Sequence, residues 1–217
     1  MAGITKPDIL IFSNGPIDND LTKMREKANV YQAYFNGFGE GPLVLLWRFP
    51  FPRAIWIVDP DIVYLQYYEL SRKVISYVKR DGGTVILGGL FASFIRLIDL
   101  HIYFELLDVP WRAGQCERTT VFLQGSHVGL EPTARARLAT SYSSEALFLK
   151  NVPPSDSLYA SPKGAMSESA TLDPIPIKAQ SSVVFGRCGH GWLGFTGDLN
   201  NEEGTAEAVL AMMGLLD

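Results

Sequence analysis

The strongest constraint on this chain is a series of short, continuous apolar runs, each closed by residues that favour turns. The runs cover residues 8–13, 54–59 and 84–87, and the turns are Ser13-Asn14-Gly15-Pro16, Asp59-Pro60 and Gly88-Gly89. Runs in which apolar and polar side chains do not alternate are typical of strands that are buried on both faces. Such strands predict a parallel sheet that lies between two layers of helices.

The segments between these runs carry helical patterns. The predicted helices cover residues 63–78 and 91–102, with shorter ones after Asp18 or Asp20 and from Pro42 to Trp47. Residues 29–35 fit a helix or a strand, and their aromatic and β-branched content favours the strand. The alternation of strand and helix predicts an open, doubly wound α/β sheet for residues 1–110.

The second half of the chain has a different character. It carries predicted strands at 119–123 and 146–149, a short helix near 133–139, a hairpin of 182–185 with 192–196, and a last helix from Asn200 or Asn201. Six of the 13 prolines lie between Pro132 and Pro176, beside Ser-, Ala- and Gly-rich sequence. This composition predicts an irregular insertion over residues 124–181 rather than a second core.

Length and charge exclude several classes of protein. The 217 residues fit a single domain, 1–217, and a net charge of −4 gives no general attraction to nucleic acid or to anionic membranes. The longest stretch without a charged residue, 82–95, is too short to span a bilayer. Two cysteines cannot form a disulfide framework, and the first residues lack the order of a secretory signal, so we expect a cytoplasmic protein.

Candidate ligand-binding residues follow from the predicted sheet, because open parallel sheets bind ligands beyond the carboxyl ends of their strands. The candidates at these turns are Ser13, Asn14, Asp59, Gly88, Gly89, Phe91 and Asn200, to which we add Arg118. Gly88-Gly89 lets the backbone approach a ligand and exposes the N–H groups of the next helix, or it serves only a tight turn. The segment matches neither a phosphate-binding lysine loop nor a Gly-x-Gly-x-x-Gly motif. No cofactor is therefore predicted.

Three residues are candidates for catalysis: Ser93, His190 and Asp198. Ser93 lies a turn inside a predicted helix rather than at its sharp start, which weakens it as a nucleophile. His190 shares a strand face with Cys188, but two ligands without a third do not make a metal site, and none is predicted. Asp198 either faces the ligand cleft or holds a backbone turn. Asp59 likewise either positions a base or caps a turn.

Two further features concern reactivity and partners. Cys116 has basic neighbours that can lower its thiol pKa. Tyr64 and Tyr68 lie together on one helix and can mark a contact between protomers, which makes a homodimer a candidate assembly.

The chain also resembles the class I glutamine amidotransferase-like superfamily. The residues that carry the resemblance are Ile57-Val58-Asp59, residues 81–89 (DGGTVILGG) and residues 191–204 (GWLGFTGDLNNEEG). Residues 111–120 and 141–143 are similar to a narrower group of uncharacterised fungal members, distantly like the trehalose-utilisation (ThuA-like) proteins. The resemblance implies a flavodoxin-like fold, doubly wound and mostly parallel, with helices on both faces.

The chain departs from this superfamily at the reactive residues. The superfamily's nucleophilic cysteine follows the strand at 84–87, where this chain has Gly88-Gly89-Leu90-Phe91. The downstream His-x-Glu pair is also missing, since Gly191 and Trp192 follow His190. We therefore do not expect glutamine hydrolysis by the Cys-His-Glu route.

Three functions remain open at this point. The first is a small-molecule-binding protein that lacks the nucleophile, with its ligand at the carboxyl ends of the strands. The second is a hydrolase or lyase-like enzyme built from Asp59, the Gly88-Gly89 backbone donors, Ser93, Arg118, His190 and Asp198. The third is an interaction module that docks a partner or a second copy.

Overall fold

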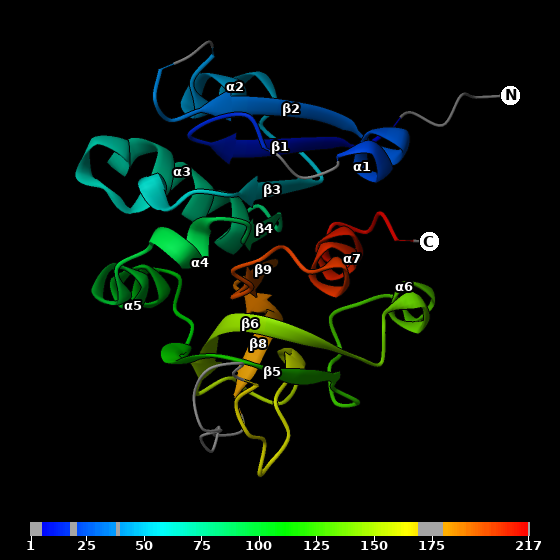
Figure 1. Cartoon of the computed structure of the whole chain (residues 1–217). Helices are drawn as coiled ribbons and strands as arrows, with labels where there is room; N and C mark the ends of the chain where they lie inside the picture. Colours follow the sequence, from blue (N-terminus) through cyan, green and yellow to red (C-terminus); the bar gives the residue numbers. More distant parts are fainter. Residues whose placement is uncertain (1–5, 18–20, 38–39, 169–179, 217) are drawn as a thin grey trace, which may run out of the picture.

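A single nine-stranded sheet runs through the molecule in the strand order β2-β1-β3-β4-β9-β8-β6-β5-β7 (Figure 1). This computed structural model describes residues 6–17, 21–37, 40–168 and 180–216. The first five strands in this order are β2 (Asn29–Tyr34), β1 (Asp8–Ser13), β3 (Ala54–Ile57), β4 (Thr84–Leu87) and β9 (Gly191–Thr196). The other four are β8 (Ser181–Cys188), β6 (Ser141–Lys150), β5 (Arg112–Leu123) and β7 (Ser157–Ala160).

The five-stranded part is parallel throughout. β1 pairs with β2 and β3, β3 pairs with β4, and β4 pairs with β9. All four residues of β3 are buried, as are the last three of β4, so the continuous apolar runs do mark strands that are covered on both faces. The preferred strand at 29–35 is also confirmed, as β2.

The prediction of a mostly parallel, flavodoxin-like doubly wound sheet is wrong for the chain as a whole. β8 runs antiparallel to β9, and β6, β5 and β7 continue antiparallel. A further antiparallel pairing of β7 with β8 closes these four strands into a small barrel. The barrel begins at the predicted hairpin, because the turn at Gly189 brings β8 back beside β9 and so reverses the strand direction.

The segment expected to be an irregular insertion supplies much of this barrel. Residues 124–181 contain β7, most of β6 and helix α6 (Pro132–Arg137). The barrel strands are harder to recognise because their outer residues are polar and partly exposed, whereas Val121, Phe148 and Leu158 point into a buried core. Prolines and small residues here lie in the connections between strands.

Helices cover both faces of the parallel strands. One face carries α2 (Pro42–Arg48), α3 (Tyr68–Lys79), α4 (Phe91–Phe94) and α5 (Leu97–Leu106), and the other carries α1 (Thr22–Lys27) and α7 (Glu203–Met212). Figure 1 shows α3 and α5 on one side of the sheet and α1 and α7 on the other. No helix in the described part of the chain has both the length and the apolar character that crossing a membrane requires.

Two predicted helices have different bounds. The helix expected over 63–78 begins at Tyr68, after two 3-10 turns, η1 (Pro60–Val63) and η2 (Leu65–Tyr67). The helix expected over 91–102 is interrupted, because Ile95 and Arg96 have extended backbones with ψ of 133° and 135°. Ile95 is buried, whereas Arg96 caps α5 and pairs with Asp99 at 2.5 Å. The positions proposed for the cap of the first helix, residues 18 and 20, lie outside the described residues.

Gly191 provides a test of the entry of β9 into the sheet. A Cβ atom at this position would lie 2.1 Å from the carbonyl oxygen of Gly83 and 2.4 Å from that of Val78. Both are backbone atoms, so Gly191→Ala should lower the free energy of unfolding by about 3 kcal/mol through overpacking. Urea denaturation followed by circular dichroism measures this change. Gly125→Ala is the matched control, since no described atom lies within 4 Å of its Cβ position, and an equal loss in both variants would contradict the packing.

Candidate functional site

A cavity of about 270 Å³ lies at the carboxyl ends of β3, β4 and β9, between α1 and the first half of α7. We call it the Trp56 cavity. Its lining is Leu21, Lys23, Met24, Trp56, Gly89, Thr196, Asp198, Asn201, Glu203, Thr205, Ala206, Glu207, Val209 and Leu210. The cavity therefore lies where parallel sheets bind ligands, with an apolar wall and a few polar groups.

Trp56 is the central polar donor of this cavity. Its side chain is 5% exposed, yet Nε1 has no hydrogen-bond partner among the described residues. A buried donor without a partner costs about 1–3 kcal/mol, so such an atom is usually satisfied by a ligand or an ordered water.

Gly88 keeps this donor accessible. A Cβ atom on Gly88 would lie 2.4 Å from Thr196 Oγ1 and 3.3 Å from Trp56 Nε1. The missing side chain therefore lets the Trp56 indole and the Thr196 hydroxyl lie next to each other. Gly89 adopts φ of +66°, a left-handed conformation that lets the chain turn sharply after β4.

Asp198 holds the turn before α7 and also lines the cavity. Its buried carboxylate accepts the backbone N–H groups of Asn200 at 2.9 Å and Glu202 at 2.7 Å. Asn201 between them has φ of 56°, so α7 begins at Glu203 and not at Asn200 or Asn201. The side chain of Asn200 is not a cap, because it donates to Glu145 of β6 at 3.0 Å.

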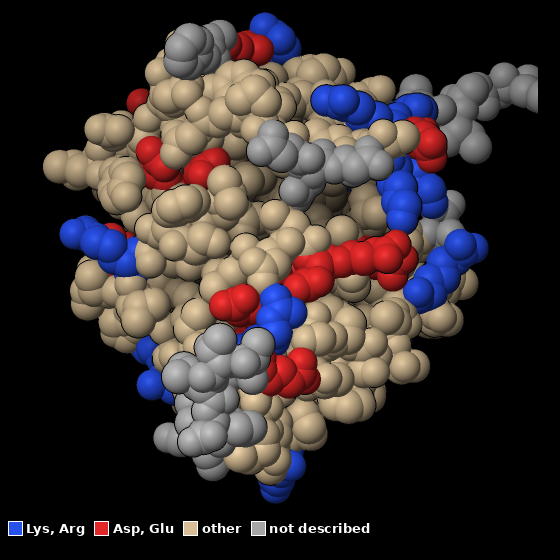
Figure 2. All heavy atoms as spheres, viewed as in Figure 1, with Lys and Arg blue, Asp and Glu red and all other residues tan. Residues whose placement is uncertain are grey.

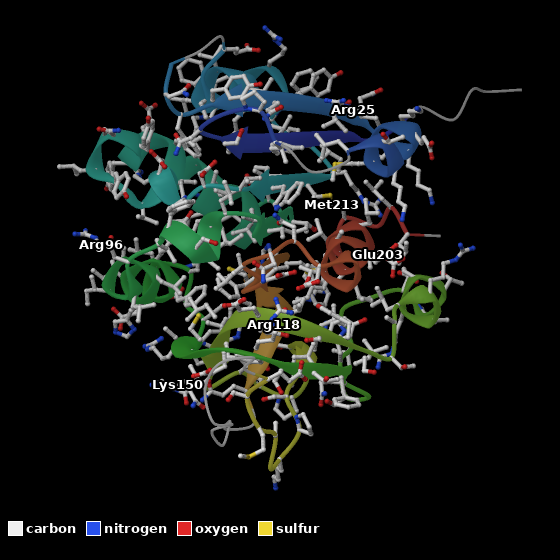
Figure 3. All side chains as sticks on the ribbon, in the orientation of Figure 1. Arg25, Arg96, Arg118, Lys150, Glu203 and Met213 are labelled. Atoms are coloured by element: carbon white, nitrogen blue, oxygen red, sulfur yellow. The ribbon has the colours of Figure 1, made fainter. Side chains whose placement is uncertain are left out.

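Acidic side chains lie at the rim of the cavity. Figure 2 shows them gathered over α7, and Figure 3 labels Glu203 on this helix. Glu203 and Glu207 line the cavity together with buried Asp198, whereas Lys23 on α1 is the one basic residue among the described lining residues. This balance favours a ligand that is uncharged or cationic at the rim.

The predicted residues after β1 and β3 form a separate polar cluster. Asp59 Oδ2 accepts the backbone N–H of Asn14 at 2.7 Å, and the Asn14 side chain donates to Asp61 at 2.6 Å. The Ser13 hydroxyl donates to the Gly15 carbonyl at 2.8 Å. None of these residues lines the Trp56 cavity.

Burial sets the ionisation of Asp59. It raises the pKa of this carboxyl above its ordinary value of 3.8, the hydrogen bond from Asn14 lowers it, and the negative charge of Asp61 raises it further. The net direction is upward, so the folded protein holds this proton more tightly than the unfolded chain does.

The candidates for catalysis do not converge. Ser93 is exposed on α4, and His190 precedes β9 at the amino ends of the parallel strands, where its Nδ1 lies 3.2 Å from the Arg80 carbonyl. Arg118 lies on β5 (Figure 3) and pairs with Glu202 at 3.2 Å. Phe91 is fully buried on the α3–α5 face of the sheet. Among the residues described, no hydrogen bond or ion pair joins any two of Asp59, Ser93, Arg118, His190 and Asp198.

Neither thiol is activated. Burial raises the pKa of Cys188 to about 11, and its Sγ donates to the Leu107 carbonyl at 3.2 Å. Burial, Glu145 and Glu117 raise the pKa of Cys116, so the expected lowering by basic neighbours is wrong. In the described ranges no group of three or more His, Cys, Asp or Glu side chains is placed to hold a metal ion.

Sequence reasoning missed the residues that shape the cavity. Trp56 lies in an apolar run and has the pattern of a core residue, and Thr196 ends a strand without a distinguishing motif. The available signal was the indole itself, because a buried tryptophan N–H normally finds a partner.

Solved structures with the same fold include three that match almost all of this chain. A putative ThuA-like protein from Parabacteroides merdae ATCC 43184 gives a TM-score of 0.53 at 11% identity, over 97% of this chain and 91% of that one. A putative GMP synthase protein from Thermoplasma acidophilum gives 0.53 at 10% identity, over 97% and 94%. A cytoplasmic protein from Salmonella typhimurium LT2 gives 0.55 at 12% identity, over 97% and 99%.

These likenesses support the glutamine amidotransferase-like and ThuA-like part of the resemblance, and they concern the fold alone. No protein-family model matches the chain, and no curated protein sequence does. None of the three similar structures comes from a fungus, so the fungal part of the resemblance gains no support.

Asp59 generates a prediction about pH. We expect the stability of the wild type relative to Asp59→Asn to rise as the pH is lowered from neutrality towards 3.8. The folded state takes up this proton at a higher pH than the unfolded chain, so folding gains free energy across that window, by at most about 1.4 kcal/mol per pH unit. Urea denaturation at a series of pH values measures the difference. A shift in favour of the variant would show that the Asn14 hydrogen bond outweighs burial.

Proposed function

We propose that this protein binds a small molecule in the Trp56 cavity. The observation that carries the proposal is the buried Trp56 N–H group, which has no partner in the described part of the chain and lines a cavity at the carboxyl ends of three parallel strands. The ligand supplies a hydrogen-bond acceptor to this group. Binding then removes the cost of an unsatisfied donor, which adds to the affinity.

The remaining lining restricts the ligand further. Leu21, Met24 and Leu210 offer an apolar surface, so part of the molecule is apolar. Glu203 and Glu207 at the rim accept hydrogen bonds, so the outer part carries hydroxyl, amide or amino donors. The ligand class is a small, uncharged or cationic molecule with an inner acceptor and outer donors.

The separation of the candidate catalytic residues favours binding over catalysis. A general acid or base has to lie within hydrogen-bond reach of the group on which it acts. Asp198 is the only one of them that lines the cavity, and its carboxylate accepts two backbone N–H groups. The cytoplasm is the compartment we propose, supported by the description of one similar structure as a cytoplasmic protein.

A library of small polar molecules tests this proposal through ligand-induced thermal stabilisation. We expect hits whose affinity falls by about tenfold in Trp56→Phe, because the phenyl ring preserves the packing and removes only the donor and part of the ring. Trp47→Phe is the matched control, since Trp47 is 58% exposed and lies outside the cavity. Its affinities should equal those of the wild type.

Two outcomes would contradict binding as the function. One is a set of hits whose affinities are the same in Trp56→Phe and the wild type, because these ligands bind elsewhere. The other is turnover of esters, lactones or amides that is lost on substitution of a cavity residue, which would favour the enzyme.

A further inference from the structure

An exposed apolar surface lies on the side of the molecule away from the Trp56 cavity. Its members are Tyr64, Leu65, Tyr68, Ile98, Ile102 and Leu106, which are between 40% and 89% exposed. All except Ile98 line one shallow groove of about 210 Å³ between η2, α3 and α5, and Ile98 lies one turn of α5 before Ile102. We call this the α5 surface.

We propose that a second copy of this chain covers the α5 surface in a two-fold symmetric dimer. Its six side chains present on the order of 600 Å² of apolar area per copy, close to the roughly 800 Å² per partner that a stable interface buries. The polar residues around the patch supply the remaining area as a rim. Interfaces between identical chains are also richer in apolar area than transient ones.

The charges at the ends of α5 are complementary to themselves. Arg96 lies at the amino end of this helix (Figure 3) with a side chain that is 70% exposed, and Glu105 lies near the carboxyl end at 54%. A two-fold axis near the middle of α5 sets the two helices antiparallel, so Arg96 of each copy faces Glu105 of the other. The helix dipoles are then antiparallel as well, which is the favourable arrangement.

The neighbouring charges leave this pairing available. Arg96 pairs within its own helix with Asp99 at 2.5 Å, and Glu105 pairs with His101 at 3.2 Å and Arg112 at 3.3 Å. These partners fix the two charged groups at the edges of the apolar surface. An unrelated partner protein would not be required to match both charges, whereas a second copy matches them by symmetry.

Sedimentation velocity over a range of concentrations tests the dimer with the full chain. We expect the wild type to approach twice the mass of 24.0 kDa as its concentration rises. Ile102→Glu buries an unpaired carboxylate twice in each dimer, so its dissociation constant should rise by about a hundredfold. Val128→Glu is the matched control, because Val128 is 72% exposed and lies outside the α5 surface.

A charge-reversal cycle tests the antiparallel arrangement. Arg96→Glu and Glu105→Arg should each weaken the dimer, and the double variant should restore it, because the opposite charges face each other again. A wild type that stays monomeric at every concentration would overturn the proposal. So would a dimer that Ile102→Glu leaves intact, since another surface would then hold the two copies together.

Discussion

The parallel pairing of β9 with β4 is the interaction on which the rest of this structure depends. It joins a strand near the end of the chain to one from the first half, in a register that sets Leu87 beside Phe195. Thr196 therefore lies next to Gly88, and α7 follows directly along the same edge. The barrel depends on the same strand, because β8 is attached to the sheet through β9. A single long-range pairing thus organises both halves of the molecule.

This pairing also explains why the cavity is polar at its base. Three neighbouring strands end together, and their last residues bring an indole, a hydroxyl and a glycine into contact. A larger residue at Gly88 would fill the space between Trp56 and Thr196. The fold thus keeps a buried donor open at the place where it could have been covered by one methyl group, at a cost to stability that a ligand can offset.

The sequence predicted the parallel strands well because their signal is local. Continuous apolar runs ended by Gly, Pro and Asp need no knowledge of distant contacts, and β1, β3, β4 and the hairpin follow from them. The barrel could not be predicted in this way, because its closure depends on the pairing of β7 with β8 across 20 or more residues of sequence. The polar outer residues of β5 also weaken any strand pattern.

The site was predicted in its location and missed in its chemistry. The ends of the parallel strands could be recognised from Gly88-Gly89 and Asp198, and both line or shape the cavity. Which of the many polar residues at this edge face one another depends on side-chain packing across β3, β4 and β9. Asp59 and Asn14 satisfy each other instead, so a pair that resembled a binding site holds a turn.

A crystallographic fragment screen on the wild-type protein measures the central claim most directly. The account predicts density for fragments in the Trp56 cavity, with an acceptor atom about 3 Å from Trp56 Nε1. Fragments found only at other sites, with a side chain of this protein accepting the hydrogen bond of Trp56 Nε1, would contradict it.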